Sequence, residues 1–410
     1  MTRRLPRTGV VAACAAAFVV TLGAFAALNG ATQPAAHAPA ASVLAITRRG
    51  NDELQRARET ADPAHYALAQ AAFSSALRRD PRSVDATIGM ATLALARHDF
   101  REGLRYAQRA RRLGPGLVRP FSVLVDAEVE LGRYARAGRT LQRMIDLRPS
   151  LASYARVSYF RELHGDLAGA TRAMGLAVSA GGGVPENVAY VQTLLGDLEA
   201  LRGHADGARR AYAAALVGVA GYVPAIAGRA QLDAATGHLR AAIRGYEEIV
   251  RRRPLPQYVI ALGETQQAAR RRAQARETFA LVDAERRLLA ANGVNTDVEI
   301  ALFEADHGAP RRALDLARRA WRAAPSVRSA DAVGWALTRA GHQSDGLAWA
   351  RRALRLGSRD PLLLTRAGLT ARAAGHDREA RRYLRRALRP NPRFSAVWAP
   401  RARRALRGLR

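Results

Sequence analysis

The sequence has no lysine and only one cysteine, and these two absences exclude several kinds of site. A phosphate-binding P-loop and a Schiff-base enzyme both need a lysine. A disulfide framework within the chain and a cysteine-based zinc site both need several cysteines. Aromatic residues make up only 6% of the chain, whereas β-sandwiches and β-barrels are rich in aromatic and β-branched residues. The composition therefore favours closely packed, alanine-rich helices.

Arginine supplies all of the positive charge. The 410 residues include 65 basic and 35 acidic ones, which gives a net charge of +30. Hydrophobic residues make up 49% of the chain, a fraction that is normal for a globular protein and too high for a disordered one. A folded, strongly basic protein is therefore expected, and the distribution of its arginines bears on its partners.

The N-terminal segment has the pattern of an export signal. Arginines at positions 3, 4 and 7 precede an uncharged, mostly apolar run over residues 9–28, and an Ala/Pro-rich stretch follows. Ala38-Pro39-Ala40 offers a cleavage site, but the apolar run is also just long enough to cross a bilayer. We therefore predict that residues 1–40 are a signal peptide or an N-terminal membrane anchor with a linker. In either case the remainder is extracytoplasmic, secreted or held at the cell membrane.

A 34-residue period runs through the rest of the chain. Pro81, Pro115 and Pro149 are evenly spaced by 34 residues. The residues before such prolines share a frame, in which a turn glycine is followed by a small residue five positions on and a bulky one four further on. Two copies of this frame are Gly132, Ala137, Leu141, Met144 and Pro149, and Gly237, Ala242, Tyr246, Ile249 and Pro254.

This frame resembles the tetratricopeptide repeat (TPR), a helix–turn–helix unit of 34 residues. The clearest copies are YVQTLLGDLEALRGHADGARRAYAAAL and LLLTRAGLTARAAGHDREARRYLRRAL, although the tryptophan usual in the first helix is missing. The resemblance implies an all-α, right-handed superhelical solenoid of about ten repeats, which we assign to residues 41–393. Because stacked repeats bury their apolar faces against their neighbours, we expect an open superhelix with contacts between neighbouring repeats only.

Residues 394–410 are expected to end the solenoid. Phe394, Val397 and Trp398 are apolar and can cover the last repeat, while the arginines that follow, Arg401 among them, are expected to face water. This segment is therefore predicted to be a C-terminal capping helix with a basic tail.

No pattern in the sequence indicates catalysis. There is no G-x-S-x-G, no H-E-x-x-H and no glycine-rich phosphate loop. Seven of the nine histidines, including His307, fall at the turn between the two helices of a repeat, where a solvated side chain is expected. Histidines one repeat apart are too distant to share a metal ion. We therefore predict a protein that is not an enzyme, with no catalytic residue, no metal site and no cofactor.

Charge is divided between the two helices of each repeat. Arginine pairs crowd the second helices, whereas the first helices carry most of the acids. In the family that the frame resembles, first helices line the concave face of the superhelix. This implies a concave groove for a protein or peptide partner, with three aromatic side chains as anchors. The predicted groove residues are Asp126, Glu130, Tyr159, Glu162, Tyr190, Asp197, Glu264, Asp331 and Trp335.

Two functions follow from these observations. The leading hypothesis is a non-catalytic protein–protein interaction scaffold of the cell envelope that binds its partner in the concave groove. The alternative is an envelope adhesion module whose arginine-rich convex face binds an anionic lipid or cell-wall polymer. Nucleic acid is disfavoured as a partner, because the export signal argues against it and aromatic residues are not interleaved with the arginines.

Overall fold

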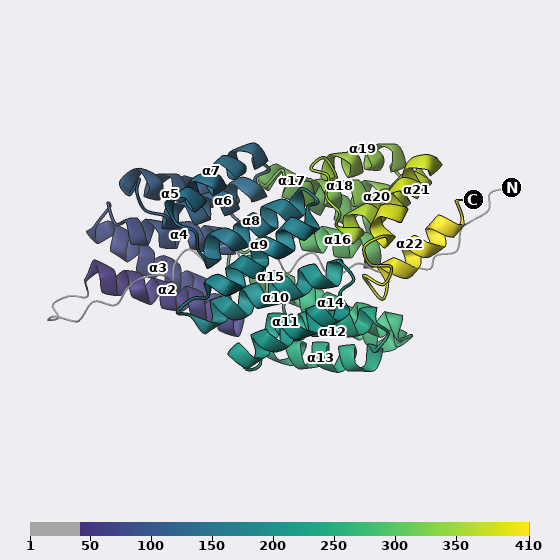
Figure 1. Ribbon diagram of the computed structural model, residues 1–410, viewed down its shortest axis with the longest axis horizontal. Helices are drawn as coiled ribbons and strands as arrows, with labels where there is room; N and C mark the ends of the chain where they lie inside the picture. The colour runs from purple at the N-terminus through teal and green to yellow at the C-terminus, as the bar shows by residue number, and fades with distance from the viewer. Residues whose placement is uncertain (1–41, 410) are drawn as a thin grey trace.

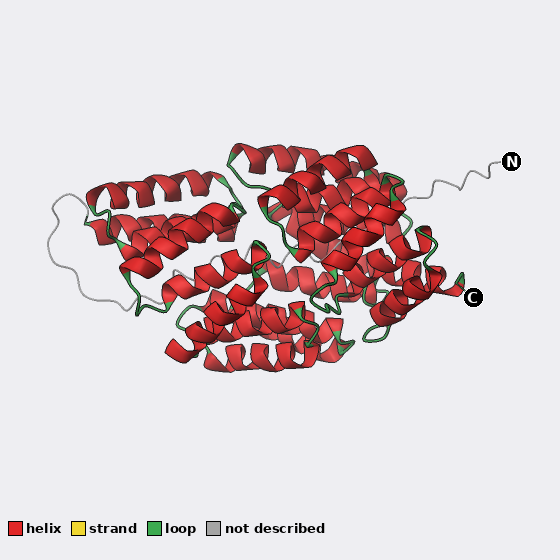
Figure 2. Cartoon of the chain, turned by 90° about the horizontal axis from the view of Figure 1, so that it is seen from above, coloured by secondary structure: helices red, strands yellow, loops and turns green. Residues whose placement is uncertain are grey.

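The computed structural model describes residues 42–409, and every regular element in that range is an α-helix (Figure 2). The 21 helices of this range form ten consecutive pairs and a final single helix. The predicted fold, an all-α solenoid of about ten TPR-like repeats, is confirmed. The pairs are α2 (Val43–Thr60) with α3 (Ala64–Arg79), α4 (Val84–Ala96) with α5 (Phe100–Leu113), α6 (Arg119–Glu130) with α7 (Tyr134–Leu147), α8 (Leu151–Leu163) with α9 (Leu167–Ala180), α10 (Pro185–Leu201) with α11 (Ala205–Gly218), α12 (Val223–Ala235) with α13 (Leu239–Arg252), α14 (Pro256–Ala268) with α15 (Arg272–Ala291), α16 (Asp297–His307) with α17 (Pro310–Ala323), α18 (Val327–Arg339) with α19 (Gln343–Ala353), and α20 (Pro361–Ala373) with α21 (Asp377–Leu388), and α22 (Trp398–Arg407) follows.

Within each pair, small residues allow the two helices to approach closely. Ala137 in α7 and Ala380 in α21 occupy the same position of the repeat frame, and both are fully buried. The bulky residue four positions later, Leu141 or Leu384, is buried beside them. The residues that recur in the sequence frame are therefore the residues that are buried in the core.

Enlarging a frame alanine should destabilise the solenoid. We expect Ala137→Leu and Ala380→Leu each to lower the free energy of unfolding by about 1–3 kcal/mol, because the added side chain would overpack a helix pair. Ala214→Leu, at an exposed position of α11, is the matched control and should change stability little. Chemical denaturation of the three variants would check this, and equal midpoints for all of them would contradict it.

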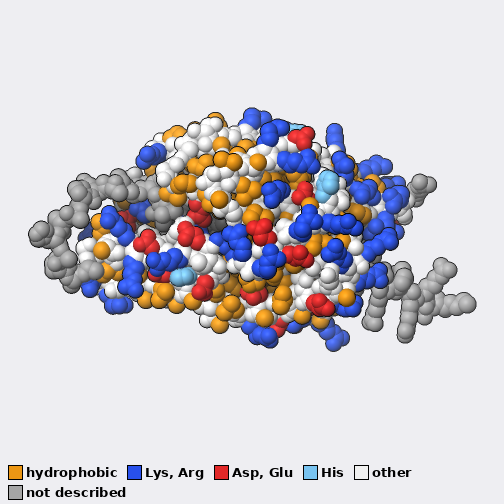
Figure 3. Space-filling view, turned by 90° about the horizontal axis from the view of Figure 1, so that it is seen from below, with side chains coloured by type: hydrophobic (Ala, Val, Ile, Leu, Met, Phe, Trp, Pro, Cys, Tyr) orange, Lys and Arg blue, Asp and Glu red, His pale blue; other side chains and the backbone are white. Residues whose placement is uncertain are grey.

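The first helices line the inner face of the superhelix. First helices of adjoining pairs contact one another directly, as α4 does α6, α6 does α8, and α18 does α20. The second helices form the outer layer, and they carry most of the exposed arginines. On the face drawn in Figure 3, arginine side chains gather toward the right-hand end and acidic side chains are fewer.

The superhelix closes on itself along a line of contacts that we call the seam. The turn within each of the first five pairs contacts the segment that follows the fifth pair after it. The turn of the first pair, for example, contacts the segment that follows the sixth pair. Figure 1 shows one part of this arrangement, where α17 and α18 lie beside α6–α8. One seam contact from each of these five pairs is, in chain order, Arg58 with Arg253, Arg97 with Asn295, Tyr134 with Val327, Gly165 with Gly357, and Ala200 with Asn391.

Four of these five seam contacts are hydrogen bonds. The Arg253 guanidinium donates to the carbonyl of Arg58 at 2.9 Å, and the amide of Asn295 donates to the carbonyl of Arg97 at 3.0 Å. The amide of Val327 donates to the Tyr134 hydroxyl at 2.9 Å, and the Asn391 side chain donates to the carbonyl of Ala200 at 2.7 Å. The expectation of an open superhelix with contacts between neighbours only is therefore wrong. Five pairs complete one turn, and the next turn packs against it.

The seam depends on glycine at its closest point. Gly132 has a φ of +68°, and a Cβ atom there would collide with the carbonyl oxygen of Pro325. Gly375 has a similar φ of +78°, but it faces open space. The two positions therefore share the same backbone requirement and differ only in the contact across the seam.

This difference makes a matched test of the seam. Gly375→Ala should cost about 1–2 kcal/mol of unfolding free energy through its positive φ alone. Gly132→Ala should cost about 1–3 kcal/mol more, because the methyl group also clashes with the neighbouring superhelical turn. Denaturation midpoints would show the difference. Equal losses for the two variants would contradict the existence of the seam in solution.

After α21, the segment that contains α22 packs against the last pairs. Phe394 and Trp398 are buried and Val397 packs beside them, so α22 covers the last pairs. Arg401 does not face water, however, because its guanidinium lies 4.8 Å from the centre of the Trp398 ring and 3.8 Å from Asp306.

The export prediction concerns residues 1–40, which lie outside the described residues. Across residues 42–409, no helix is both long enough and apolar enough to span a bilayer.

Candidate binding surfaces

The predicted groove residues lie in the inner layer, but most are not open to a ligand. Asp197 and Glu162 are partly buried. The other seven have less than a tenth of their surface exposed. Whether any of them contacts a partner stays a prediction. Those seven are Asp126, Glu130, Tyr159, Tyr190, Glu264, Asp331 and Trp335.

Two of the buried acids form equivalent ion pairs between neighbouring first helices. Asp126 of α6 accepts two hydrogen bonds from Arg156 of α8, at 2.6 and 2.9 Å. Asp331 of α18 is held in the same way by Arg366 of α20. Arg156 and Arg366 are almost fully buried. A buried carboxylate is tolerable only with such a partner, so these acids join repeats and do not form a ligand surface.

Arg328 joins the two superhelical turns from the inside. This residue of α18 lies among Glu130 of α6, Tyr159 of α8 and Glu299 of α16, and its guanidinium is 3.6 Å from the Glu299 carboxylate. The Tyr159 hydroxyl donates to Glu130 at 3.4 Å. The positive charge of Arg328 therefore faces acids from both turns, and it adds an electrostatic contact close to the Tyr134–Val327 hydrogen bond.

Four more of the predicted groove residues also have partners within the fold. Asp197 accepts a hydrogen bond from Tyr212 at 2.7 Å, and Trp335 donates its ring N–H to Asp306 at 3.3 Å. Glu264 lies 3.5 Å from the imidazole of His307, and Tyr190 is part of an apolar cluster with Leu151 and Tyr222.

His307 is not the solvated turn residue that the sequence suggested. Its side chain is only 6% exposed, and its ring packs against Phe279 and Phe303 with centroids 4.3 and 5.3 Å away. Burial lowers the pKa of His307 to about 3, so this histidine is neutral at ordinary pH. Among the residues that the structure describes, no cluster of histidine, cysteine and acidic side chains is arranged to hold a metal ion.

Burial raises the pKa values of several inner carboxyl groups. The pKa of Glu162 is raised to about 8 by burial and by the nearby carboxylates of Asp360 and Asp197. The pKa of Glu130 is raised to about 7, mainly by burial, with Arg328 acting in the opposite direction. Both groups are therefore protonated in mildly acidic solution, and they become charged inside the protein as the pH rises.

These shifts predict that the protein loses stability as the pH rises. A carboxyl whose pKa is raised by folding contributes stability below its unfolded pKa, near 4.5, and that contribution is lost as the pH rises through its folded pKa. The lowered pKa of His307 acts in the opposite direction below about pH 6.5, so urea midpoints should fall between about pH 6.5 and about pH 8. Glu162→Gln should reduce this fall, while Glu277→Gln, at an exposed position of α15, should leave it unchanged. A midpoint that rises with pH, or an unchanged slope for Glu162→Gln, would count against the buried acids.

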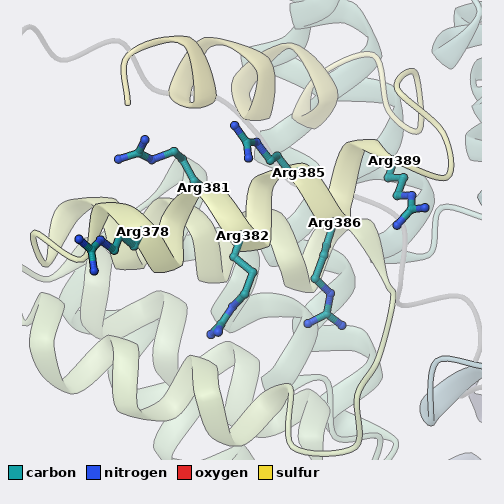
Figure 4. Close-up of a pocket in the computed structure, with 6 residues that line it drawn as sticks. All are labelled: Arg378, Arg381, Arg382, Arg385, Arg386 and Arg389. Carbon is teal, nitrogen blue, oxygen red and sulfur yellow. The ribbon is translucent and has the colours of Figure 1, made fainter. Parts of the chain in front are cut away.

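A dense cluster of arginines lies on the outer layer, along α21. Six arginines line a shallow hollow of about 620 Å³ along this helix. In Figure 4, Arg381 and Arg385 extend from one side of the helix and Arg382 and Arg386 from the other. We call this set the α21 arginine surface, and it consists of Arg378, Arg381, Arg382, Arg385, Arg386 and Arg389.

The α21 arginine surface continues into a cleft at the seam. This cleft, of about 980 Å³, lies between the α8–α9 turn and the loops that precede α20 and follow α21. Arg386 and Arg389 line both spaces, and the cleft adds Arg202, Arg359 and His164. Its one acid, Asp166, already accepts a hydrogen bond from the amide of Gly169 at the start of α9. The cleft and the helix therefore form one continuous basic surface.

One carboxylate beside the α21 arginine surface is already held by neighbouring side chains. Glu379 accepts hydrogen bonds from Arg351 of α19 at 2.6 and 3.1 Å and from the hydroxyl of Tyr383 at 2.8 Å. The contact with Arg351 is bidentate, the geometry that guanidinium groups form with carboxylates. The arginine contacts lower the pKa of Glu379, so the carboxylate remains charged.

The sequence reasoning missed the inner arginines. It treated the acids of the first helices as a free groove, but the partners of Asp126 and Asp331 are arginines 30 and 35 residues further on. That separation is close to one repeat, so an acid and an arginine one period apart were the signal that could have indicated the pairing. No comparable signal marks Arg328, whose partner Glu130 belongs to another superhelical turn.

Comparison with known proteins yields likeness of fold only. No family model and no curated protein matches the chain. The TPR domain of P58(IPK) aligns at 14% identity over 88% of this chain and 98% of that one, with a TM-score of 0.23. YrrB, described as a TPR protein with an unusual peptide-binding site, aligns at 16% identity over 46% of this chain and 95% of its own, with a TM-score of 0.31. A tetratricopeptide repeat protein from Parabacteroides merdae aligns at 15% identity over 63% and 98%, with a TM-score of 0.36.

Proposed function

We propose that this chain is a non-catalytic interaction scaffold of the cell envelope that binds an acidic protein segment on its outer, arginine-rich surface. The observation that carries the proposal is the continuous basic surface of α21 and the seam cleft, which includes eight arginines from four segments. The envelope location rests on the export pattern of residues 1–40.

Accessibility favours the outer surface of the solenoid over the inner surface as the binding site. The inner acids are joined in ion pairs and hydrogen bonds, and the seam closes the superhelix around them. On α21, by contrast, Arg378, Arg382, Arg385, Arg386 and Arg389 are exposed. A partner can therefore reach the basic surface without any rearrangement of the repeats.

The chemistry of the surface favours an acidic polypeptide over a lipid bilayer. Arg351 and, from the α21 arginine surface, Arg382 both contact the carboxylate of Glu379, and a carboxylate is the group an acidic peptide carries. Within the described part of the chain, large hydrophobic side chains that are strongly exposed lie elsewhere and not on α17, α19 or α21. Without such side chains, α21 has nothing to insert into a bilayer.

Binding of poly-L-glutamate tests the proposal. We expect it to bind more tightly than polyphosphate or vesicles that contain an anionic phospholipid, and to weaken as salt is added. Replacing Arg378, Arg382, Arg385 and Arg389 with glutamine should reduce the affinity by roughly 10- to 100-fold, at about 0.5 kcal/mol or more for each exposed charge.

A matched variant separates the site from net charge. Arg240, Arg244, Arg251 and Arg252 are also exposed, on α13, and replacing these four with glutamine changes the total charge equally. This variant should bind poly-L-glutamate almost normally. If both variants lose affinity equally, the α21 arginine surface is not a specific site. If only polyphosphate or vesicles bind, the adhesion hypothesis replaces this one.

A further inference from the structure

Two tryptophans form an outer groove that the sequence reasoning did not assign to any function. Trp321 of α17 and Trp349 of α19 pack edge to face with ring centres 4.8 Å apart, and both are only partly buried. They line a groove of about 310 Å³ between these two outer helices. Val333 and Leu337 of α18 form its apolar floor. The chain's other two tryptophans, Trp335 and Trp398, are buried in the core.

Arginines surround this groove. The guanidinium of Arg352 lies 4.5 Å from the centre of the Trp321 ring and 5.3 Å from that of Trp349, and Arg318 and Arg322 line the groove itself. Stacking on an aromatic ring fixes a guanidinium while its edge can still donate hydrogen bonds. Asp345 is the single acid among the residues that line the groove, so the rim favours an anionic partner.

The groove adjoins the α21 arginine surface. Arg351, next to Arg352 in α19, pairs with Glu379 of α21, so α17, α19 and α21 form consecutive parts of the outer layer. A peptide that lies across α19 could contact the groove and the arginine surface together.

We propose that the Trp321–Trp349 groove anchors an apolar side chain, such as phenylalanine or leucine, of an acidic peptide segment. Carboxylates on either side of that side chain would pair with Arg318, Arg322 and Arg352. The proposal rests on the proposed function for the kind of partner, and it adds a specific anchor to a surface that charge alone would leave unselective.

The size and composition of the groove support this occupant. Its volume is at the lower end of the range for ligand pockets, about 300–1,000 Å³, which suits one side chain and not a large cofactor. Aromatic side chains beside arginine are the composition of energetically dominant interface sites. A second copy of this chain is a poor occupant, because a net charge of +30 would bring arginines against arginines.

Two synthetic peptides test the anchor. One carries a single phenylalanine flanked by glutamates, and the other has serine in place of the phenylalanine. Measured by fluorescence anisotropy on the full chain, the phenylalanine peptide should bind at least about tenfold more tightly than the serine peptide. Equal affinities, or no binding of either peptide, would overturn the proposal.

A substitution at the rim locates the site without removing core atoms. Ala348 lines the groove and is exposed, so Ala348→Glu places a negative charge there and should abolish the preference for phenylalanine. Ala214→Glu, at an exposed position of α11, should preserve it, and circular dichroism would show that both variants are folded. If Ala348→Glu keeps the full preference, the anchor lies elsewhere and the proposal fails.

The outcomes for the groove and for the arginine surface are distinguishable. The four-arginine variant of α21 should weaken both peptides by a similar factor and leave their ratio unchanged. If poly-L-glutamate does not bind but the phenylalanine peptide does, and Ala348→Glu removes that binding, the groove is supported and the proposed role of the α21 surface is not.

Discussion

The register of five pairs for each superhelical turn is the constraint on which the rest of the structure depends. It brings the turn of each early pair against the segment that follows a pair about 190 residues later, so the ten pairs form two turns in direct contact. An open solenoid has neighbour contacts only. This one also has hydrogen bonds between turns, and glycines such as Gly132 allow the loops to approach. The closed seam removes the inner face from easy contact with a partner.

Closure also explains how the charges are arranged. Acids that would line an exposed groove are buried, and each buried charge needs a partner or must be protonated. Asp126 and Asp331 have arginine partners, Glu130 lies beside Arg328, and burial raises the pKa values of Asp126, Glu130 and Glu162. Only a few arginines pair with these inner acids, and most of the exposed arginines lie on the second, outer helices. The outer layer therefore offers an acidic partner positive charges on accessible side chains.

The sequence predicted the architecture better than the site. The recurring small and bulky residues, such as Ala137 and Leu141, report packing within a pair and between neighbours, and both are local in sequence. Phe394 and Trp398 likewise indicated the cap. The contact of Tyr134 with Val327 joins residues 193 positions apart, and no period in the sequence encodes it. Because the sequence does not reveal that contact, it suggested that the acids of the first helices line an exposed groove. The same limit applies to Arg401 and His307, whose burial depends on how distant helices meet.

Small-angle X-ray scattering of the chain during a titration with poly-L-glutamate tests the central claim, that the partner binds outside a closed superhelix. The account predicts that the free protein scatters as the compact two-turn particle of Figure 1, and that saturation with the ligand leaves that particle closed and adds mass only at its outer surface. An elongated particle in the free state, or an expansion on binding that indicates opened superhelical turns, would contradict it.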